Sequence, residues 1–217
     1  MLGGSMDLFL QFLITGILVG SIYALVALGC TLIYKCSGVL NLAMGELTVI
    51  GAYVCLTFYN WGIPFIPALI FTLAVGFALG LLTEHLFLRP MVGEPILSVI
   101  MVTVGLSFFF KGMVELIWGT DTVVFKPPVF PSEPLFIGKV VVGQVYLWAF
   151  VASIILLLAF VSFFKFTKWG LSMQATADDE MAALSLGVNA KIVYALAWAI
   201  AFMAAGVGGT PLVISMG

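Results

Sequence analysis

Six long apolar stretches divide this sequence and restrict it to folds that are stable within a lipid bilayer. A helix that crosses the hydrocarbon core needs about 20 mostly apolar residues, and each stretch reaches that length. Charged residues make up only 8% of the chain, against roughly 25% in soluble domains. The expected fold is an all-α, polytopic transmembrane helical bundle of about six spans, formed as a single domain over residues 1–217. The predicted spans are 8–34, 38–59, 64–88, 96–118, 143–165 and 191–214.

Several classes of function are excluded by patterns that the sequence lacks. The net charge is −2 and no basic stripe is present, which argues against nucleic acid as a partner. Neither G-x-x-x-x-G-K-[ST] nor the Rossmann glycine pattern occurs, so no nucleotide is expected to bind by those means. The single histidine, His85, and three cysteines without C-x-x-C spacing suit neither a zinc site nor a serine-type triad. We therefore expect neither an enzyme nor a chain with its own cofactor or metal.

Lysine and arginine are distributed unequally between the loops and predict the orientation. Cytoplasmic loops carry an excess of these residues. With the loop at Lys35 inside, alternation of the spans places five basic residues inside and two outside, and it puts the N-terminus outside. The inside set is Lys35, Arg89, Lys165, Lys168 and Lys191, and the outside set is Lys126 and Lys139; Lys111 lies within a predicted span.

The predicted external loop, 119–143, contains four prolines together with several large apolar residues. Residues 135–142 could form a small β-hairpin that turns at Gly138 and Lys139, because turn residues there separate two apolar runs. A loop with this many apolar residues could be either a lid packed on the bundle or a docking surface for an extracytoplasmic partner.

The predicted internal loop, 165–191, contains the signals of one short helix. Thr176 and Asp179 match the capping box [ST]-x-x-[DE], with Thr176 as N-cap, and Gly187 stands where a glycine ends a helix. The expected helix runs over 177–186 and is roughly 15 Å long. Its first turn carries Asp178, Asp179 and Glu180, and its other side carries Ala182, Ala183 and Leu186.

Two kinds of surface could accept this internal helix. A helix that lies on the membrane usually carries basic residues on its polar face and bulky anchors on the other. Here the polar face is acidic, as the dipole favours in a first turn, and the other face is mostly alanine. This composition favours docking into the groove of a cytoplasmic partner.

Glu46 is the ionisable residue that stands out within a span. It lies about 12 Å along the second predicted span, near the bilayer middle, where carboxyl groups usually face a cavity or a polar partner. Asn41, Gly45 and Thr48 are spaced by four and three residues and are expected to share one helix face. Together with Glu46, these three residues form a candidate translocation path or gate. The alternative is an interhelical hydrogen bond that only holds the bundle together.

Other small and charged residues indicate packing rather than a site. The spacing GxxxG, which lets helices approach closely, occurs at 16–20 and at 76–80. Glu84 and Arg89 lie at the inner end of the third predicted span, where long side chains reach the interface at low cost.

Several segments together resemble the permeases of branched-chain amino-acid ABC importers, and the resemblance covers essentially the whole chain. One of them, 180–189, is similar to the cytoplasmic loop of that family, a variant of its E-A-A-x-x-x-G coupling motif. The segments are 20–29 (GSIYALVALG), 41–46 (NLAMGE), 51–53 (GAY), 89–90 (RP), 180–189 (EMAALSLGVN) and 204–209 (AAGVGG).

The resemblance implies a subunit of a binding-protein-dependent importer in the bacterial inner membrane. In such a transporter two permeases, identical or homologous, pair with two cytoplasmic ATPases, which use the ATP, and an extracytoplasmic solute-binding protein delivers the substrate. The internal helix would be the coupling helix that sits in the ATPase groove. Its contact residues would be Asp179, Glu180, Ala182, Ala183, Leu186 and Gly187.

The chain departs from the family pattern at two positions and is shorter than the family. Met44 stands where histidine is common, and Lys35 where glycine is common. The substrate class therefore remains open among branched-chain or aromatic amino acids, urea and short amides. The family is expected to continue through about two further spans beyond Gly217.

A second function from a different class also fits the apolar spans. The chain could be a self-sufficient channel or a proton-coupled carrier in which Glu46 is the proton site. The internal loop discriminates between the two, because a carrier has no need of a capped docking helix.

Overall fold

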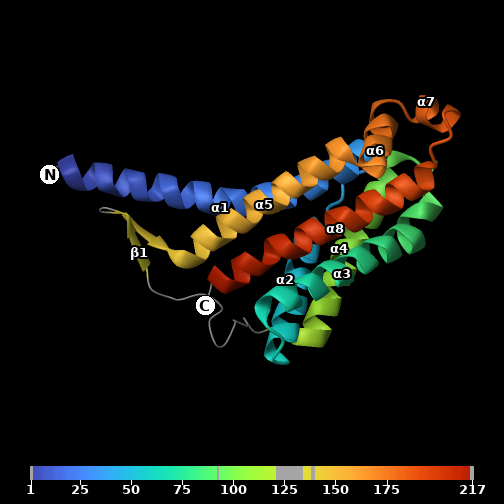
Figure 1. Ribbon diagram of the computed structural model, residues 1–217. Helices are drawn as coiled ribbons and strands as arrows, with labels where there is room; N and C mark the ends of the chain where they lie inside the picture. The colour runs from blue at the N-terminus through green and yellow to red at the C-terminus, as the bar shows by residue number, and fades with distance from the viewer. Residues whose placement is uncertain (1, 92, 121–133, 138–139, 216–217) are drawn as a thin grey trace.

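The computed structural model describes residues 2–91, 93–120, 134–137 and 140–215, and they form a bundle of long helices (Figure 1). The long helices are α1 (Leu2–Ser37), α2 (Met44–Asn60), α3 (Phe65–Thr83), α4 (Ile96–Trp118), α5 (Gln144–Phe166) and α8 (Ala190–Ser215). Shorter elements are the π-helical turn η1 (Glu84–Leu88), the 3₁₀ turn η2 (Arg89–Met91), α6 (Lys168–Asp178) and α7 (Glu180–Ser185). The prediction of an all-α transmembrane bundle is confirmed.

Five helices of the described chain are long and apolar enough to cross a membrane. They occupy Leu8–Ser37, Phe65–Met91, Ile96–Trp118, Tyr146–Phe166 and Ala190–Thr210. Each of the five corresponds to one of the six predicted spans. The second predicted span, 38–59, has no counterpart among them, because helix α2 begins only at Met44 and has 17 residues.

The first six residues of the second predicted span, 38–43, are not helical. A methyl group on Gly29 of α1 would lie 2.9 Å from Cε of Met44. Gly29 precedes the last residue of α1 by eight positions, so α2 begins about 12 Å inside the end of α1. Six extended residues reach up to about 20 Å and α2 adds about 25 Å. A non-helical segment followed by a short helix therefore takes the place of the second predicted span.

Helix α8 lies between α1 and α5 on one side and α2, α3 and α4 on the other (Figure 1). Glycines make this placement possible, since a Cβ on Gly51 of α2 would collide with the backbone of Gly206. A Cβ on Gly80 of α3 would lie 2.5 Å from Cα of Ala199. The close packing predicted for 76–80 is confirmed. Gly16 and Gly20 have no atom within 4 Å of such a Cβ within the described residues, so that spacing is not used here.

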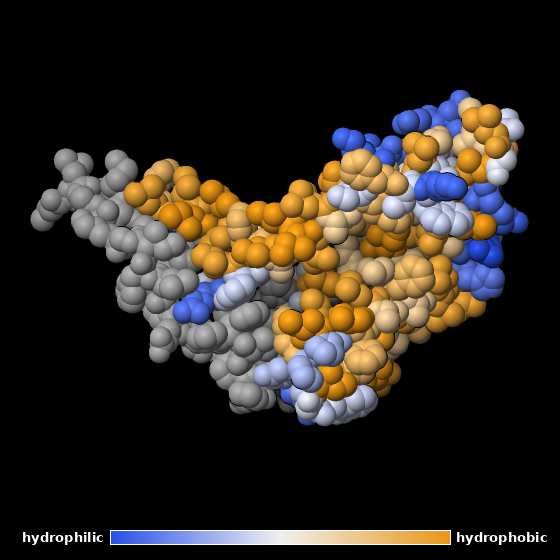
Figure 2. Space-filling model, viewed as in Figure 1, coloured by the Kyte–Doolittle hydropathy of each residue, from blue (hydrophilic) through white to orange (hydrophobic). Residues whose placement is uncertain are grey.

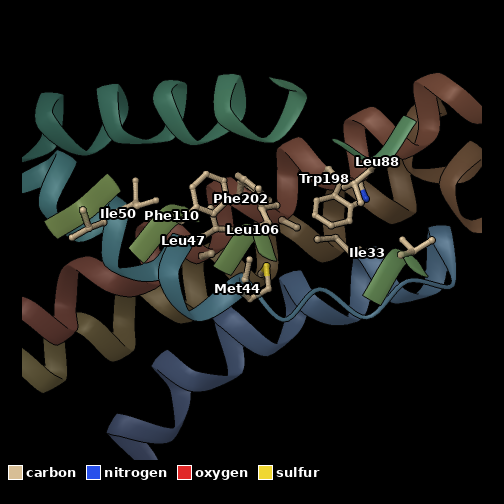
Figure 3. Close-up of a cluster of buried hydrophobic side chains, with 14 residues drawn as sticks. Ile33, Met44, Leu47, Ile50, Leu88, Leu106, Phe110, Trp198 and Phe202 are labelled. Carbon is tan, nitrogen blue, oxygen red and sulfur yellow. The ribbon is translucent and has the colours of Figure 1, made fainter. Parts of the chain in front are cut away.

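The main hydrophobic core lies where α2, α4 and α8 meet (Figure 3). Trp198 and Phe202 of α8 pack with Leu106 and Phe110 of α4, and Met44 joins them from the first turn of α2. Trp198 and Phe202 are among the largest fully buried side chains of the described chain. This core fixes the depth at which α2 begins.

The two ends of the bundle differ in character. Strands β1 (Pro134–Ile137) and β2 (Val140–Gly143) pair in antiparallel fashion before α5, which confirms the predicted hairpin. The predicted turn at Gly138 and Lys139 lies outside the described residues. Hydrophilic residues gather at the opposite end, over α6 and α7, while the visible flank of the helices is mostly hydrophobic (Figure 2).

Candidate functional site

The non-helical segment 38–43 is held by side chains that bond to its backbone. The amide oxygen Oδ1 of Asn41 accepts a hydrogen bond from the backbone N–H of Ala43 at 3.0 Å. The hydroxyl of Thr103 in α4 is shared between two carbonyl oxygens, that of Ile100 in its own helix at 2.8 Å and that of Leu40 at 3.2 Å. Unwound backbone at membrane depth is stable only where protein or water satisfies its polar groups. Asn41 and Thr103 bond to two of the backbone polar groups of this segment.

The four residues predicted to form a path do not share one helix face. Asn41 precedes α2 and is buried, with 2% of its surface exposed. Gly45 is exposed and Glu46 is half-buried in the first turn of α2. Thr48 is buried, its hydroxyl donates to the carbonyl of Met44, and Gly209 of α8 packs against its backbone. The shared-face prediction is wrong because the helix starts after Asn41 and buries Thr48 against α8.

Glu46 nevertheless lies deep in the bundle, at the positive end of the α2 dipole. Within the described residues its carboxyl group has no hydrogen-bond or ion-pair partner. The first-turn N–H groups of a helix also have no partner within the helix, and at Gly45 no side chain covers the backbone. The first turn of α2 thus presents backbone donors and a carboxylate acceptor on its accessible side.

Asn41 contributes a second unpaired group close to this turn. Its Nδ2 is buried and has no hydrogen-bond partner among the described residues. Leaving a buried donor unsatisfied costs about 1–3 kcal/mol. The Asn41 Nδ2 and the Glu46 carboxylate are therefore two polar groups without a partner among the described residues close to the start of α2.

The internal helix begins later than predicted. Thr176 lies within α6, where its hydroxyl donates to the carbonyl of Ser172. Asp179 is the N-cap of α7, and its Oδ1 accepts from the backbone N–H of Ala182 at 3.0 Å. The predicted helix 177–186 is thus wrong as a single element. Its first two residues end α6, and α7 is a separate helix of six residues.

The predicted end of this helix at Gly187 is confirmed. Gly187 has φ of +86°, a conformation that glycine adopts without strain. Its N–H donates to the carbonyl of Leu184, and the N–H of Val188 donates to the carbonyl of Ala183, each at 3.0 Å. This is the Schellman pattern, in which a left-handed glycine closes the last turn. Both ends of α7 are therefore fixed by local hydrogen bonds.

The exposed face of α7 is different from the predicted one. Ala183 is only 2% exposed and packs against its own chain, so it is not available to a partner. Met181, Leu184 and Leu186 are 74%, 45% and 84% exposed, and we call them the apolar tip. Sequence reasoning found Leu186 but missed Met181 and Leu184. Their signal was the spacing of three residues, which places Met181 and Leu184 on one side of a helix.

Helix α7 is joined to the bundle through α8 and α6. The hydroxyl of Tyr194 in α8 donates to Oε1 of Glu180 at 2.6 Å. Met173 of α6 is fully buried in a cluster with Leu32 of α1 and Val193 of α8. The apolar tip is thus carried on a unit that is anchored to two membrane helices.

The remaining reactive groups have structural partners or lie apart. Arg89 pairs with the buried carboxylate of Glu84 at 3.3 Å. The three cysteines are free thiols. Among the residues that the structure describes, no three His, Cys, Asp or Glu side chains lie close enough to hold a metal ion.

Comparison with known proteins shows the family. The sequence model of the family described as "Branched-chain amino acid transport system / permease component" matches residues 12–217. The permease protein LivH of the high-affinity branched-chain amino acid transport system of Salmonella typhimurium is 29% identical over 94% of this chain and 70% of its own. LivH of Escherichia coli is 28% identical over the same shares.

A third relative comes from another genus. The permease protein BraD of the corresponding system of Pseudomonas aeruginosa is 27% identical over 96% of this chain and 72% of its own. No solved structure is significantly similar to the chain. With a match over nearly its whole length, and with the apolar helices of a multi-pass membrane protein, the chain belongs to the family of permease components of branched-chain amino acid transport systems.

Proposed function

We propose that the chain is the membrane-spanning permease of an ATP-driven, binding-protein-dependent importer of branched-chain or related hydrophobic amino acids in a bacterial inner membrane. Its partners are two cytoplasmic ATPases, a second permease and an extracytoplasmic solute-binding protein. The matching relatives are named as permeases of branched-chain amino acid transport. The ATP is bound and hydrolysed by the partner ATPases, since this chain carries no P-loop sequence.

The observation that carries the proposal is the construction of α7. A free surface loop has no reason to be capped at both ends, joined to α8 and tipped with exposed apolar side chains. Asp179 caps the start, Gly187 ends it, and Glu180 accepts the hydroxyl of Tyr194. Exposed apolar patches with a polar surround mark protein interaction sites. We assign the apolar tip as the surface that enters a groove of the ATPase.

The apolar tip lies at the end of the bundle that we assign to the cytoplasm. Two grooves lie at this end. One is bordered by Lys35, Lys165 and Asp178, and the other by Glu94 and Glu180. The excess of basic residues predicted for inner loops supports this assignment.

Leu186→Asp tests the docking role of α7. Burying a leucine contributes about 1.5–3 kcal/mol, so its loss weakens ATPase binding by roughly 10- to 100-fold, and a buried, unpaired carboxylate weakens it further. The measurement is co-purification of the ATPase with the permease from membranes, alongside ATP-dependent uptake. Both should fall while the amount of inserted permease stays constant.

The matched control is Asn189→Asp, which adds the same charge three residues away. Asn189 is exposed and its Oδ1 accepts from the N–H of Lys191, a bond that aspartate can also accept. This control should keep both ATPase and uptake. If Leu186→Asp behaves like the control, α7 is a surface loop and the proposal loses its main support.

We further propose that the first turn of α2 lines the translocation path. Gly45 and Glu46 are its accessible residues, while Asn41 and Thr48 hold the segment and the helix in place. A carboxylate beside free backbone donors suits a substrate that carries both an ammonium and a carboxylate group. Among the substrate classes open to the family, this favours amino acids over urea and amides.

The alternative, a proton-coupled carrier, is favoured by one observation. The Glu46 carboxyl has no hydrogen-bond or ion-pair partner among the described residues. That carrier would transport without an ATPase, and its function would not depend on the apolar tip. The Leu186→Asp variant therefore also separates the two functions.

A further inference from the structure

A groove of about 660 Å³ lies between α1, α5 and α6 at the end of the bundle that carries α7. Helix α5 runs beside α1 toward this end, where α6 packs against both helices (Figure 1). The groove is not part of the candidate path, because α2 contributes none of its lining residues. Its volume is typical of sites that hold a small organic molecule.

One end of the groove is cationic. Lys35 of α1 and Lys165 of α5 both line it and both are exposed. Neither ammonium group has an ion-pair partner among the described residues. The amide of Gln174 also lines this end, together with one acid, Asp178. The charges at the groove therefore sum to one positive unit, from two lysines and one aspartate.

The other end of the groove is apolar. Leu28 and Leu32 of α1 line it together with Phe160 and Val161 of α5. Leu28 precedes Lys35 by seven residues, so the apolar end lies about 10 Å deeper along α1 than the lysine. The groove thus changes from hydrocarbon to cation over about two helical turns, in the direction that leads from the membrane interior to its surface.

We propose that this groove binds an anionic glycerophospholipid of the cytoplasmic leaflet. Its phosphate would lie between Lys35 and Lys165, and an acyl chain would lie along Leu28, Leu32 and Phe160. Basic pockets between membrane helices on the cytoplasmic side bind anionic headgroups. The orientation rests on the proposed function, in which this end faces the cytoplasm. The lipid then braces α6, and with it the unit that carries the apolar tip.

The test is lipid binding by the purified transporter complex, measured by native mass spectrometry with phosphatidylglycerol against phosphatidylcholine. Lys35→Ala/Lys165→Ala should weaken phosphatidylglycerol binding by roughly 30-fold, since each lysine near an anionic headgroup supports about a fivefold gain. Phosphatidylcholine binding should stay unchanged. Lys168→Ala/Lys191→Ala is the matched control, because it removes the same charge at the same end from residues that do not line the groove. Equal weakening in the control would overturn the proposal in favour of a general surface effect.

A second measurement identifies the occupant directly. Val161 lines the groove and is 50% exposed, so it accepts a photo-crosslinking side chain. Illumination of the assembled complex in membranes should yield a phospholipid adduct. An adduct with a polypeptide instead would show that protein fills the groove, and the lipid proposal would fall. Neither readout involves ATPase binding or uptake, so either result leaves the proposed transport function to its own test.

Discussion

At the scale of single residues, Glu46 is the side chain whose role can be measured most sharply. We expect Glu46→Ala to lower uptake per assembled complex by roughly 10- to 100-fold, because a charged hydrogen-bonding group contributes about 1.5–3 kcal/mol. Glu46→Gln should retain a larger share of uptake, since the amide oxygen can still accept a hydrogen bond from the substrate's ammonium group. The measurement is uptake normalised to the amount of complex, with the exposed Glu115→Gln as control.

Two results would contradict this account of Glu46. Unchanged uptake in Glu46→Ala would make the carboxylate a structural contact only. Complete loss in Glu46→Gln, with the complex intact, would show that the proton itself is needed and would support the carrier.

The sequence predicted that Glu46 lies near the bilayer middle, but it did not predict the path of the chain that leads to Glu46. In the structure α2 begins beside Gly29, about 12 Å inside the end of α1. The non-helical segment before Met44 lies against the Thr103 hydroxyl, which is 63 residues away along the chain. The spacing of residues within one span gives no information on a bond to a residue of another helix.

At the scale of elements, the link between α7 and α8 predicts a variant that separates binding from coupling. Tyr194→Phe keeps the ring in its cluster and removes the hydroxyl that donates to Glu180. We expect the ATPase to bind as before, while substrate imported per ATP hydrolysed falls, because α7 can then move independently of α8. The measurement is uptake and hydrolysis in the same proteoliposomes.

The matched control for this variant is Tyr34→Phe, since Tyr34 is exposed on α1. It should leave the ratio of uptake to hydrolysis unchanged. A normal ratio in Tyr194→Phe would show that the hydrogen bond does not transmit motion between the two helices.

The boundaries of α7 show what local sequence can and cannot decide. Gly187 was predictable because only a residue tolerant of positive φ suits that position. The N-cap was misassigned because threonine and aspartate are both good caps, and α6 extends through Thr176 to Asp178. The burial of Ala183 depends on how α7 rests on the bundle, which no local pattern contains.

At the scale of the whole molecule, the apolar runs determined the architecture and glycines determined the packing. In the most apolar part of α8, 61% of residues are buried, against 11–22% in the other four spans. Helix α8 is therefore the centre of the subunit, as Gly51, Gly80 and Gly206 allow. The mostly exposed flanks of the other spans are the surfaces available to lipid and, in the proposed transporter, to a second permease.

Docking of an ATPase through α7 can be tested by uptake into proteoliposomes. The assembled complex is reconstituted with solute-binding protein on one side and ATP on the side of α7, and labelled leucine is followed. If α7 docks the ATPase, uptake should require both ATP and the binding protein, persist when a protonophore is added, and be lost in Leu186→Asp. Uptake that is driven by a proton gradient without ATP, and that survives Leu186→Asp, would contradict this role of α7.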